Sequence, residues 1–182
     1  LETLFGKPPK THLSFQSSGK NSSTLNLPEE ITEDLLCEVL RHPTVASKGF
    51  LITIGDRSVT GLIARDQFVG PWQVPVADYG LCKTSFAGKS GEAMAIGERT
   101  PLSLISSKSA AKISVAEVIT NIIPSGIAKL SDIKLSANWM GSPGKLDGNK
   151  DLFEAVEAIG MELCPKWNIT IPVGKDSLSM ST

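Results

Sequence analysis

Length, composition and charge exclude several classes of protein. The chain has 182 residues, 41% of them hydrophobic, and its 18 basic residues balance 19 acidic ones, so bulk positive charge does not direct it to nucleic acid. No apolar stretch reaches the roughly 20 residues of a membrane-spanning helix, and three widely spaced cysteines suit neither a metal pair nor a disulfide framework. We expect a cytoplasmic chain with a hydrophobic core and reduced thiols, and neither a nucleic-acid nor a membrane partner.

The amino-terminal stretch differs in composition from the rest of the chain. Residues 1–27 carry few apolar positions and many Ser, Thr, Lys and Pro residues, so they bury too little surface to offset the entropy of ordering. We interpret them as a linker or draped arm before one domain at 28–182. A helix is predicted for 28–41, because a proline suits its start and apolar residues recur at helical spacing until a His-Pro pair ends it.

Short apolar runs after Gly49 predict strands. Residues 50–54 and 59–64 flank a Gly-Asp turn, which indicates a hairpin. Residues 76–86 are predicted to form a further extended segment with a bend at Asp78. The stretch 91–98 is rich in Ala and Met, and we expect a short helix there.

The second half of the chain alternates helices with strands. Residues 107–123 form the clearest predicted helix, and a strand at 133–139, a helix at 151–163 capped by Asp151 and a final strand at 169–173 follow. This order predicts an α+β fold in which helices cover one face of a mixed or antiparallel sheet. The face that we expect the 107–123 helix to bury carries Ile113, Ala116, Thr120 and Ile123.

One pair of side chains on the 107–123 helix could carry chemistry. Glu117 and Asn121 are four residues apart and therefore share a helix face. A carboxylate with an amide oxygen suits a hard cation such as Mg²⁺, which takes one or two carboxylates and the phosphates of a nucleotide. The alternative is an exposed glutamate and a local hydrogen bond near the helix end. Asp78 follows a strand-like run, so it is either a further ligand or a turn former.

Other polar motifs give weaker signals. The run Gly174–Ser177 (GKDS) follows an apolar strand in the manner of a phosphate loop, but the first glycine of the Walker pattern is missing. A turn at the strand end is at least as consistent with it. Arg65 and Asp66 form either an ion pair at a surface turn or a site pair. No histidine or cysteine has the local partners that nucleophilic catalysis requires.

Several long motifs in the right order carry a family resemblance. Together they closely resemble the large, single-chain form of phosphoribosylformylglycinamidine (FGAM) synthase, a glutamine-dependent ligase of de novo purine biosynthesis. The resemblance extends from about Lys48 to the end of the chain and, more weakly, to its first residues. The motifs are Gly55–Asp78 (GDRSVTGLIARDQFVGPWQVPVAD), Gly91–Glu98 (GEAMAIGE), Lys134–Met140 (KLSANWM) and Pro172–Met180 (PVGKDSLSM).

The resemblance implies a fold and an activity. Such enzymes hold two copies of an aminoimidazole-ribonucleotide-synthetase-like (PurM-like) unit, and this chain is similar to the α+β N-terminal domain of the second copy. The family condenses ATP, formylglycinamide ribonucleotide (FGAR) and glutamine-derived ammonia to FGAM, ADP and phosphate. Its catalytic ATP loop and its glutaminase triad lie outside this sequence, so we expect no catalytic residue here.

The resemblance also implies a nucleotide site. Asp78, Glu117 and Asn121 match the family's Mg²⁺ ligands at the second copy's nucleotide site, and Lys48 and Ala77 match positions that contact the nucleotide. A final Mg²⁺-binding aspartate belongs to a later C-terminal domain in the family. This site is similar to an auxiliary ADP site with a structural role, so the expected cofactors are Mg²⁺ and ATP or ADP.

We expect a fragment of a larger enzyme. The chain begins at Leu1 and stops at Thr182, directly after a strand-like run. Its implied partners are the first PurM-like copy, the C-terminal domains and the glutaminase of the same enzyme. Alone, the domain would expose a strand edge and an apolar face, so we expect it to be inactive and to form a homodimer. The alternative is a non-catalytic nucleotide-binding or assembly domain, and a kinase-like relative of the superfamily ranks last.

Overall fold

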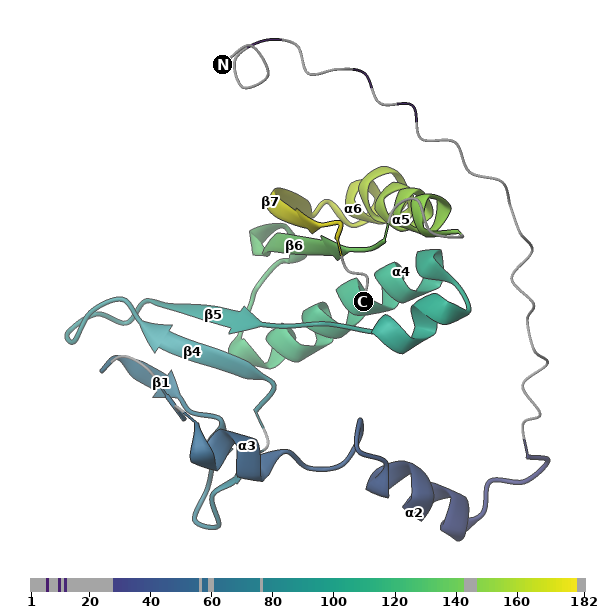
Figure 1. Cartoon of the computed structure of the whole chain (residues 1–182). Helices are drawn as coiled ribbons and strands as arrows, with labels where there is room; N and C mark the ends of the chain where they lie inside the picture. Colours follow the sequence, from purple (N-terminus) through teal and green to yellow (C-terminus); the bar gives the residue numbers. More distant parts are fainter. Residues whose placement is uncertain are drawn as a thin grey trace. The chain divides into compact units, whose positions relative to one another are not determined.

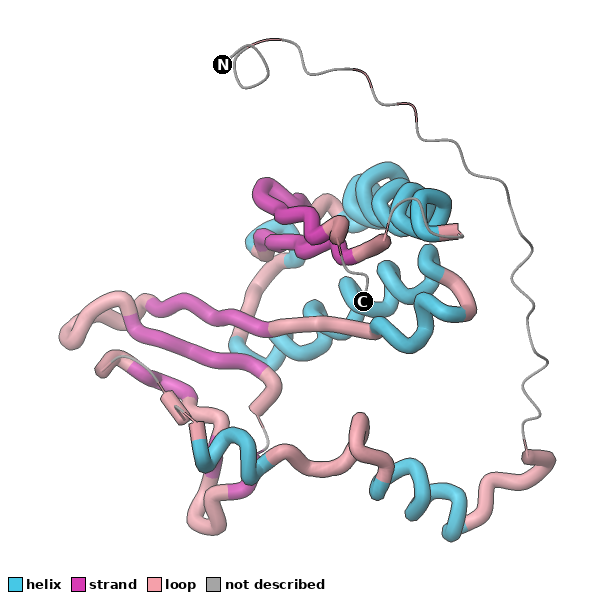
Figure 2. The backbone as a smooth tube through the Cα atoms, in the orientation of Figure 1, coloured by secondary structure: helices cyan, strands magenta, loops and turns pink. Residues whose placement is uncertain are grey.

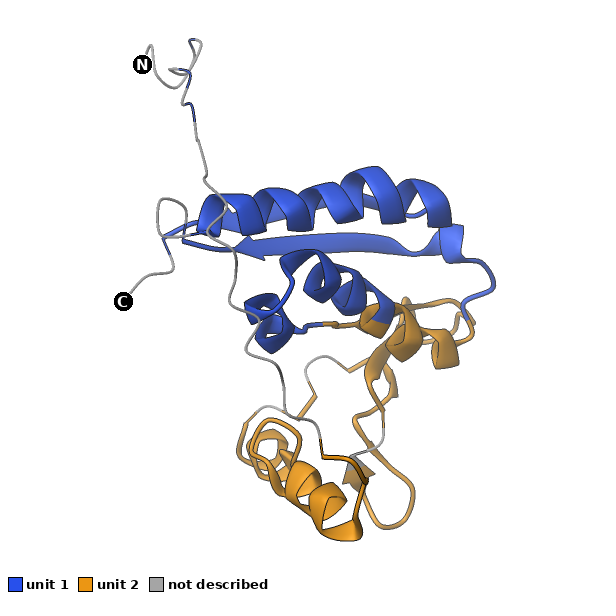
Figure 3. Ribbon diagram, turned by 90° about the vertical axis from the view of Figure 1, so that its right-hand side faces the viewer, with its two compact units in different colours: residues 1–21, 98–116, 127–182 blue, residues 22–97, 117–126 orange. Residues whose placement is uncertain are grey.

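The chain divides into two compact units, which Figure 3 colours separately. Unit 1 takes the described residues of 1–21, 98–116 and 127–182, and unit 2 takes those of 22–97 and 117–126. The predicted linker at 1–27 lies outside the described residues except at three positions. The computed structural model describes residues 6, 10, 12, 28–55, 57–58, 61–75, 77–142 and 147–179.

Two short helices begin unit 2 (Figure 1). In α2 (Glu33–Arg41), the Thr32 hydroxyl accepts a hydrogen bond from the Leu35 amide at 3.2 Å, and the helix ends before the His-Pro pair as predicted. The helix α3 (Gly49–Ile54) occupies the run that we predicted as a strand, so that strand and its hairpin are wrong. A six-residue apolar run has no period that separates a helix from a strand.

A three-stranded antiparallel sheet, magenta in Figure 2, belongs to unit 2. Its order is β1 (Ile63–Arg65), β4 (Tyr79–Lys83) and β5 (Gly91–Ala95). The strand β5 corrects our prediction of a helix: all five residues pair with β4, and this pairing outweighs the helix preference of Ala and Met. Position 91 requires glycine, because a Cβ there would lie 2.7 Å from the Cys82 carbonyl oxygen.

A small hairpin precedes the predicted metal ligand Asp78. The strands β2 (Phe68–Val69) and β3 (Val74–Pro75) pair antiparallel around a tight turn. Both Gly70 and Gln73 take positive φ angles in this turn, and the Gln73 amide donates to the Gly70 carbonyl at 3.2 Å. The chain then bends at Asp78 and enters β4, as the sequence predicted.

The long helix α4 (Ser107–Ile122) confirms the predicted helix, but it buries a different face. Apolar residues lie on several sides of this helix, so their spacing alone did not select the inner face. The expected face includes Ile113, which is 43% exposed, and Ile123, which is 53% exposed. The apolar residues of α4 that are buried are Ala110, Val115, Ile119 and Ile122.

No helix in the described part of the chain is long and apolar enough to cross a membrane.

Unit 1 is built on a β-α-β unit. The strands β6 (Lys134–Met140) and β7 (Thr170–Ser177) pair in parallel, and Figures 1 and 3 show the crossover helix along one face of the pair. In β6, Leu135 is buried while its neighbours on either side are exposed, so one face of the pair packs inward. The core of unit 1 outside α4 consists of Ile133, Leu135, Ala158, Ile159, Leu163 and Ile169.

The crossover helix changes its winding part-way. It comprises α5 (Gly148–Glu157), the π-helix η4 (Ala158–Leu163) and α6 (Cys164–Trp167). Asp147, not the predicted Asp151, occupies the N-cap position. In η4 the Cys164 amide bonds to the Ile159 carbonyl five residues back. The wider turn precedes Pro165, whose ring would crowd a carbonyl of a regular α-helix.

Candidate functional site

A hollow of about 380 Å³ in unit 2 brings together residues from distant parts of the sequence. Ala77 and Asp78 come from the segment between β3 and β4, and Asn121 comes from the last turn of α4. Three of the five predicted site residues therefore border one space. The hollow is lined by Gln67, Ala77, Asp78, Tyr79, Gly80, Met94, Ala95, Ile96 and Asn121.

Two hydrogen bonds within unit 2 hold the end of α4 to the strands that border the hollow. The Asn121 side-chain amide donates to the Ile96 carbonyl at 3.0 Å, and the Tyr79 hydroxyl donates to the Pro124 carbonyl at 3.3 Å. The first bond fixes the orientation of the Asn121 amide, because only its nitrogen can donate. The Oδ1 atom of Asn121 accepts no hydrogen bond from the described residues, so it is available to a ligand.

Glu117 and Lys48 lie outside the lining of this hollow. Glu117 is half-buried on α4, one turn before Asn121 and on the same helix face. Lys48 is the residue before α3, and its Nζ donates to the Ala46 carbonyl at 2.7 Å. The structure thus groups Asp78, Asn121 and Ala77 and places the other two predicted residues elsewhere in unit 2.

A polar network in unit 2 joins Arg57 to Asp66 and Gln73, and Ser58 to Asp66. The Arg57 guanidinium lies 2.8 Å from the Asp66 carboxylate and 4.4 Å from the centre of the Phe68 ring. The hydrogen bond from Arg57, with a second from the Ser58 hydroxyl, holds the pKa of Asp66 below its usual value. From the sequence we expected Asp66 either to form an ion pair with Arg65 or to share a site with it. Arg65 instead lies over the Tyr79 ring, 5.9 Å from its centre.

The Gly174–Ser177 run lies inside β7 and is neither a loop nor a turn. Paired in parallel with β6, these residues extend the predicted strand by four positions. The Lys175 ammonium donates to the Ser177 hydroxyl at 2.8 Å, and this hydroxyl donates to the side-chain oxygen Oδ1 of Asn138 at 3.4 Å. The extended backbone lacks the tight curve that cradles a phosphate.

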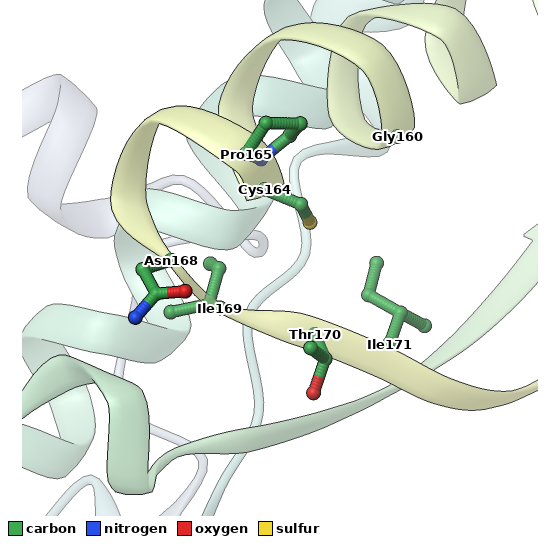
Figure 4. Close-up of a pocket in the computed structure, with 7 residues that line it drawn as sticks. All are labelled: Gly160, Cys164, Pro165, Asn168, Ile169, Thr170 and Ile171. Carbon is green, nitrogen blue, oxygen red and sulfur yellow. The ribbon is translucent and has the colours of Figure 1, made fainter.

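A second hollow, of about 400 Å³, lies in unit 1 between the end of the crossover helix and the start of β7 (Figure 4). Cys164 borders it, and burial raises the pKa of this thiol, which keeps it protonated at neutral pH. None of the predicted site residues lies here. Its lining consists of Gly160, Cys164, Pro165, Asn168, Ile169, Thr170 and Ile171.

Comparison with known families decides where this chain belongs. The sequence model of the FGAR-AT PurM_N-like domain matches residues 47–182, about three quarters of the chain. The chain belongs to this family. FGAR-AT, the FGAR amidotransferase, is another name for FGAM synthase, a ligase of purine biosynthesis, and the family is one of its domains. The resemblance carried by the four motifs is therefore correct. The match begins just before α3 and includes every residue of the unit 2 hollow.

The oxygen atoms at the hollow of this FGAR-AT PurM_N-like chain fit a magnesium nucleotide. One carboxylate and one amide oxygen make a donor set that suits Mg²⁺, which keeps waters and takes phosphate oxygens as its remaining ligands. They do not suit a zinc site, since no group of three or more His, Cys, Asp or Glu residues is gathered anywhere in the described ranges. The Arg65 guanidinium lies over the ring of Tyr79, which borders the hollow, but Arg65 is not itself part of the lining.

Two residues at this site escaped the sequence reasoning. Arg57 and Gln67 both lie within the first family motif, yet neither has a spacing that singles it out. Opposite charge is the one sequence signal that could have suggested the Arg57–Asp66 pair. No sequence signal separated Gln67 from the chain's other glutamines, because an amide side chain serves many purposes.

Proposed function

We propose that this chain is the N-terminal domain of the second PurM-like copy of an FGAM synthase and supplies a magnesium-nucleotide site. The whole enzyme converts FGAR to FGAM in the cytoplasm with ATP and glutamine. Within it, this domain binds an auxiliary Mg²⁺–ADP and joins the first copy, the C-terminal domains and the glutaminase. The domain itself contributes no catalytic residue, and alone it forms a homodimer.

One observation carries the proposal. Asp78 and Asn121 are far apart in sequence, and both border the unit 2 hollow. A carboxylate and an oriented amide oxygen are oxygen ligands of the kind that Mg²⁺ takes beside the phosphates of a nucleotide. The membership of residues 47–182 in the FGAR-AT PurM_N-like family supports the same conclusion.

The residues of the hollow have separate tasks. Asp78 and the Oδ1 atom of Asn121 hold the cation. The hydrogen bond from the Asn121 side-chain nitrogen to the Ile96 carbonyl fixes the orientation of the amide group and so of that oxygen. Glu117, one turn earlier on the same face of α4, is a further ligand of the cation, and Ala77 and Lys48 contact the nucleotide. When bound, Mg²⁺ neutralises the phosphate charge. Because a later domain completes the site, nucleotide binding stabilises the assembled enzyme by linkage.

Calorimetric titration with Mg²⁺–ADP tests this function. We expect weak binding by the 182-residue chain, which Asp78→Asn and Asn121→Leu abolish and EDTA reverses. The matched control Asp132→Asn changes an exposed acid in unit 1 and should bind as the parent does. The proposal fails if Asp78→Asn and Asp132→Asn give the same affinity as the unaltered chain.

A further inference from the structure

Gln67 is the lining residue of the unit 2 hollow with an unassigned polar side chain. Its amide nitrogen Nε2 donates to the Arg57 carbonyl at 3.3 Å, and its backbone amide donates to the Asp66 carboxylate at 2.7 Å. These bonds tie its side-chain nitrogen and its backbone amide to the polar network. The Oε1 atom of Gln67 accepts no hydrogen bond from the described residues, so an oxygen acceptor remains at the wall of the hollow.

Two features make this oxygen suited to a cation. First, Gln67 borders the hollow together with Asp78 and Asn121, so the three side chains offer one carboxylate and two amide oxygens to the same space. Second, Arg57, whose carbonyl accepts the Gln67 hydrogen bond, has its positive charge paired with Asp66. Hard divalent cations accept carbonyl oxygens of Asn and Gln as ligands beside carboxylates.

We propose that Gln67 is a further oxygen ligand of the cation in the unit 2 hollow, bound directly or through a water. The Asp66 carboxylate acts as its positioning residue, because it holds the Gln67 backbone while Arg57 and Ser58 hold the carboxylate. This inference rests on the proposed function, since it adds a ligand to the same site. It assigns a role to a residue that neither the sequence motifs nor the family resemblance singled out.

Mn²⁺ binding followed by electron paramagnetic resonance tests the assignment without any activity. Gln67→Asn shortens the side chain by one methylene and so moves the amide oxygen away from the cation. We expect the affinity for Mn²⁺–ADP to fall about tenfold. Gln67→Glu replaces the amide oxygen by a charged one and should tighten the binding of Mn²⁺ alone. The matched control is Gln73→Asn, because Gln73 belongs to the same polar network but does not border the hollow.

The outcomes separate this inference from the proposed function. If Asp78→Asn loses Mn²⁺–ADP while Gln67→Asn and Gln73→Asn both bind as the parent does, Gln67 is not a ligand and the nucleotide site stands. If Gln67→Asn and Gln67→Glu weaken binding equally, Gln67 has only a structural role and the assignment is likewise overturned. If the parent chain does not bind Mn²⁺–ADP, or if Asp78→Asn changes nothing, both proposals fall together.

Discussion

Shortening Ile159 tests whether the π-helix η4 is part of the core of unit 1. The side chain of Ile159 is 1% exposed, and Ile159→Ala removes three buried carbons. At about 0.8 kcal/mol for each buried methylene, the lost transfer free energy is about 2.4 kcal/mol. The cavity left behind adds to this, and we expect a total loss of about 3 kcal/mol in the free energy of unfolding.

Urea denaturation followed by tryptophan fluorescence measures this loss. Trp139 and Trp167 are half-buried in unit 1 and report on its unfolding. With a urea dependence of about 2 kcal/mol per molar, the midpoint should fall by about 1.5 M. The matched control is Met161→Ala in the same π-helix, where the side chain is 76% exposed and the expected change is within about 0.5 kcal/mol. Equal midpoints for the two variants would refute the packing described for η4.

Three further predictions concern pH, reactivity and a single hydrogen bond. Hydrogen bonds from Lys108 and Lys112 lower the pKa of Glu162 to about 2. Its contribution to stability is therefore complete above its ordinary pKa of 4.5 and is lost as the pH falls toward 2. In acid titrations the parent should be more stable than Glu162→Gln above that value, and the difference should shrink to nothing as the pH falls; a difference that does not change with pH would contradict the pairing. Burial raises the pKa of Cys164, so iodoacetamide should modify this thiol more slowly at pH 8 than it modifies free glutathione, and an equal rate would contradict that burial. Tyr79→Phe removes the bond to the Pro124 carbonyl and should destabilise unit 2 by about 1 kcal/mol in hydrogen-exchange measurements; unchanged exchange would show that the bond does not hold α4.

Long elements and turn signals could be predicted from the sequence, whereas short elements could not. The helix α4 follows from a long stretch without Gly or Pro that ends before Pro124, the strand β6 follows from alternating apolar residues, and the bend at Asp78 follows from the residues around it. By contrast, α3 and β5 are six and five residues long, too short for a period to separate helix from strand. Strand pairing decides β5, and that pairing is a long-range property that local preference does not contain.

The candidate site was predicted in part for a similar reason. Asp78 and Asn121 carry side chains that suit a cation, and the resemblance indicated that they share a site; the hollow that both border is consistent with this. The assignment of ligands itself remains a prediction. The role of Gln67 depends on its place in the lining of the hollow and on two hydrogen bonds that leave its side-chain oxygen without a donor among the described residues, and only three-dimensional contacts reveal them.

The most direct test of the central claim is to locate the cation. Crystals of the 182-residue chain grown with Mn²⁺ and ADP should give an anomalous-scattering peak within about 2.5 Å of oxygen atoms of Asp78 and Asn121. A peak at that place, absent from crystals of Asp78→Asn, is the result we predict. Mn²⁺ bound elsewhere on the chain, with the unit 2 hollow empty of metal and nucleotide, would contradict it.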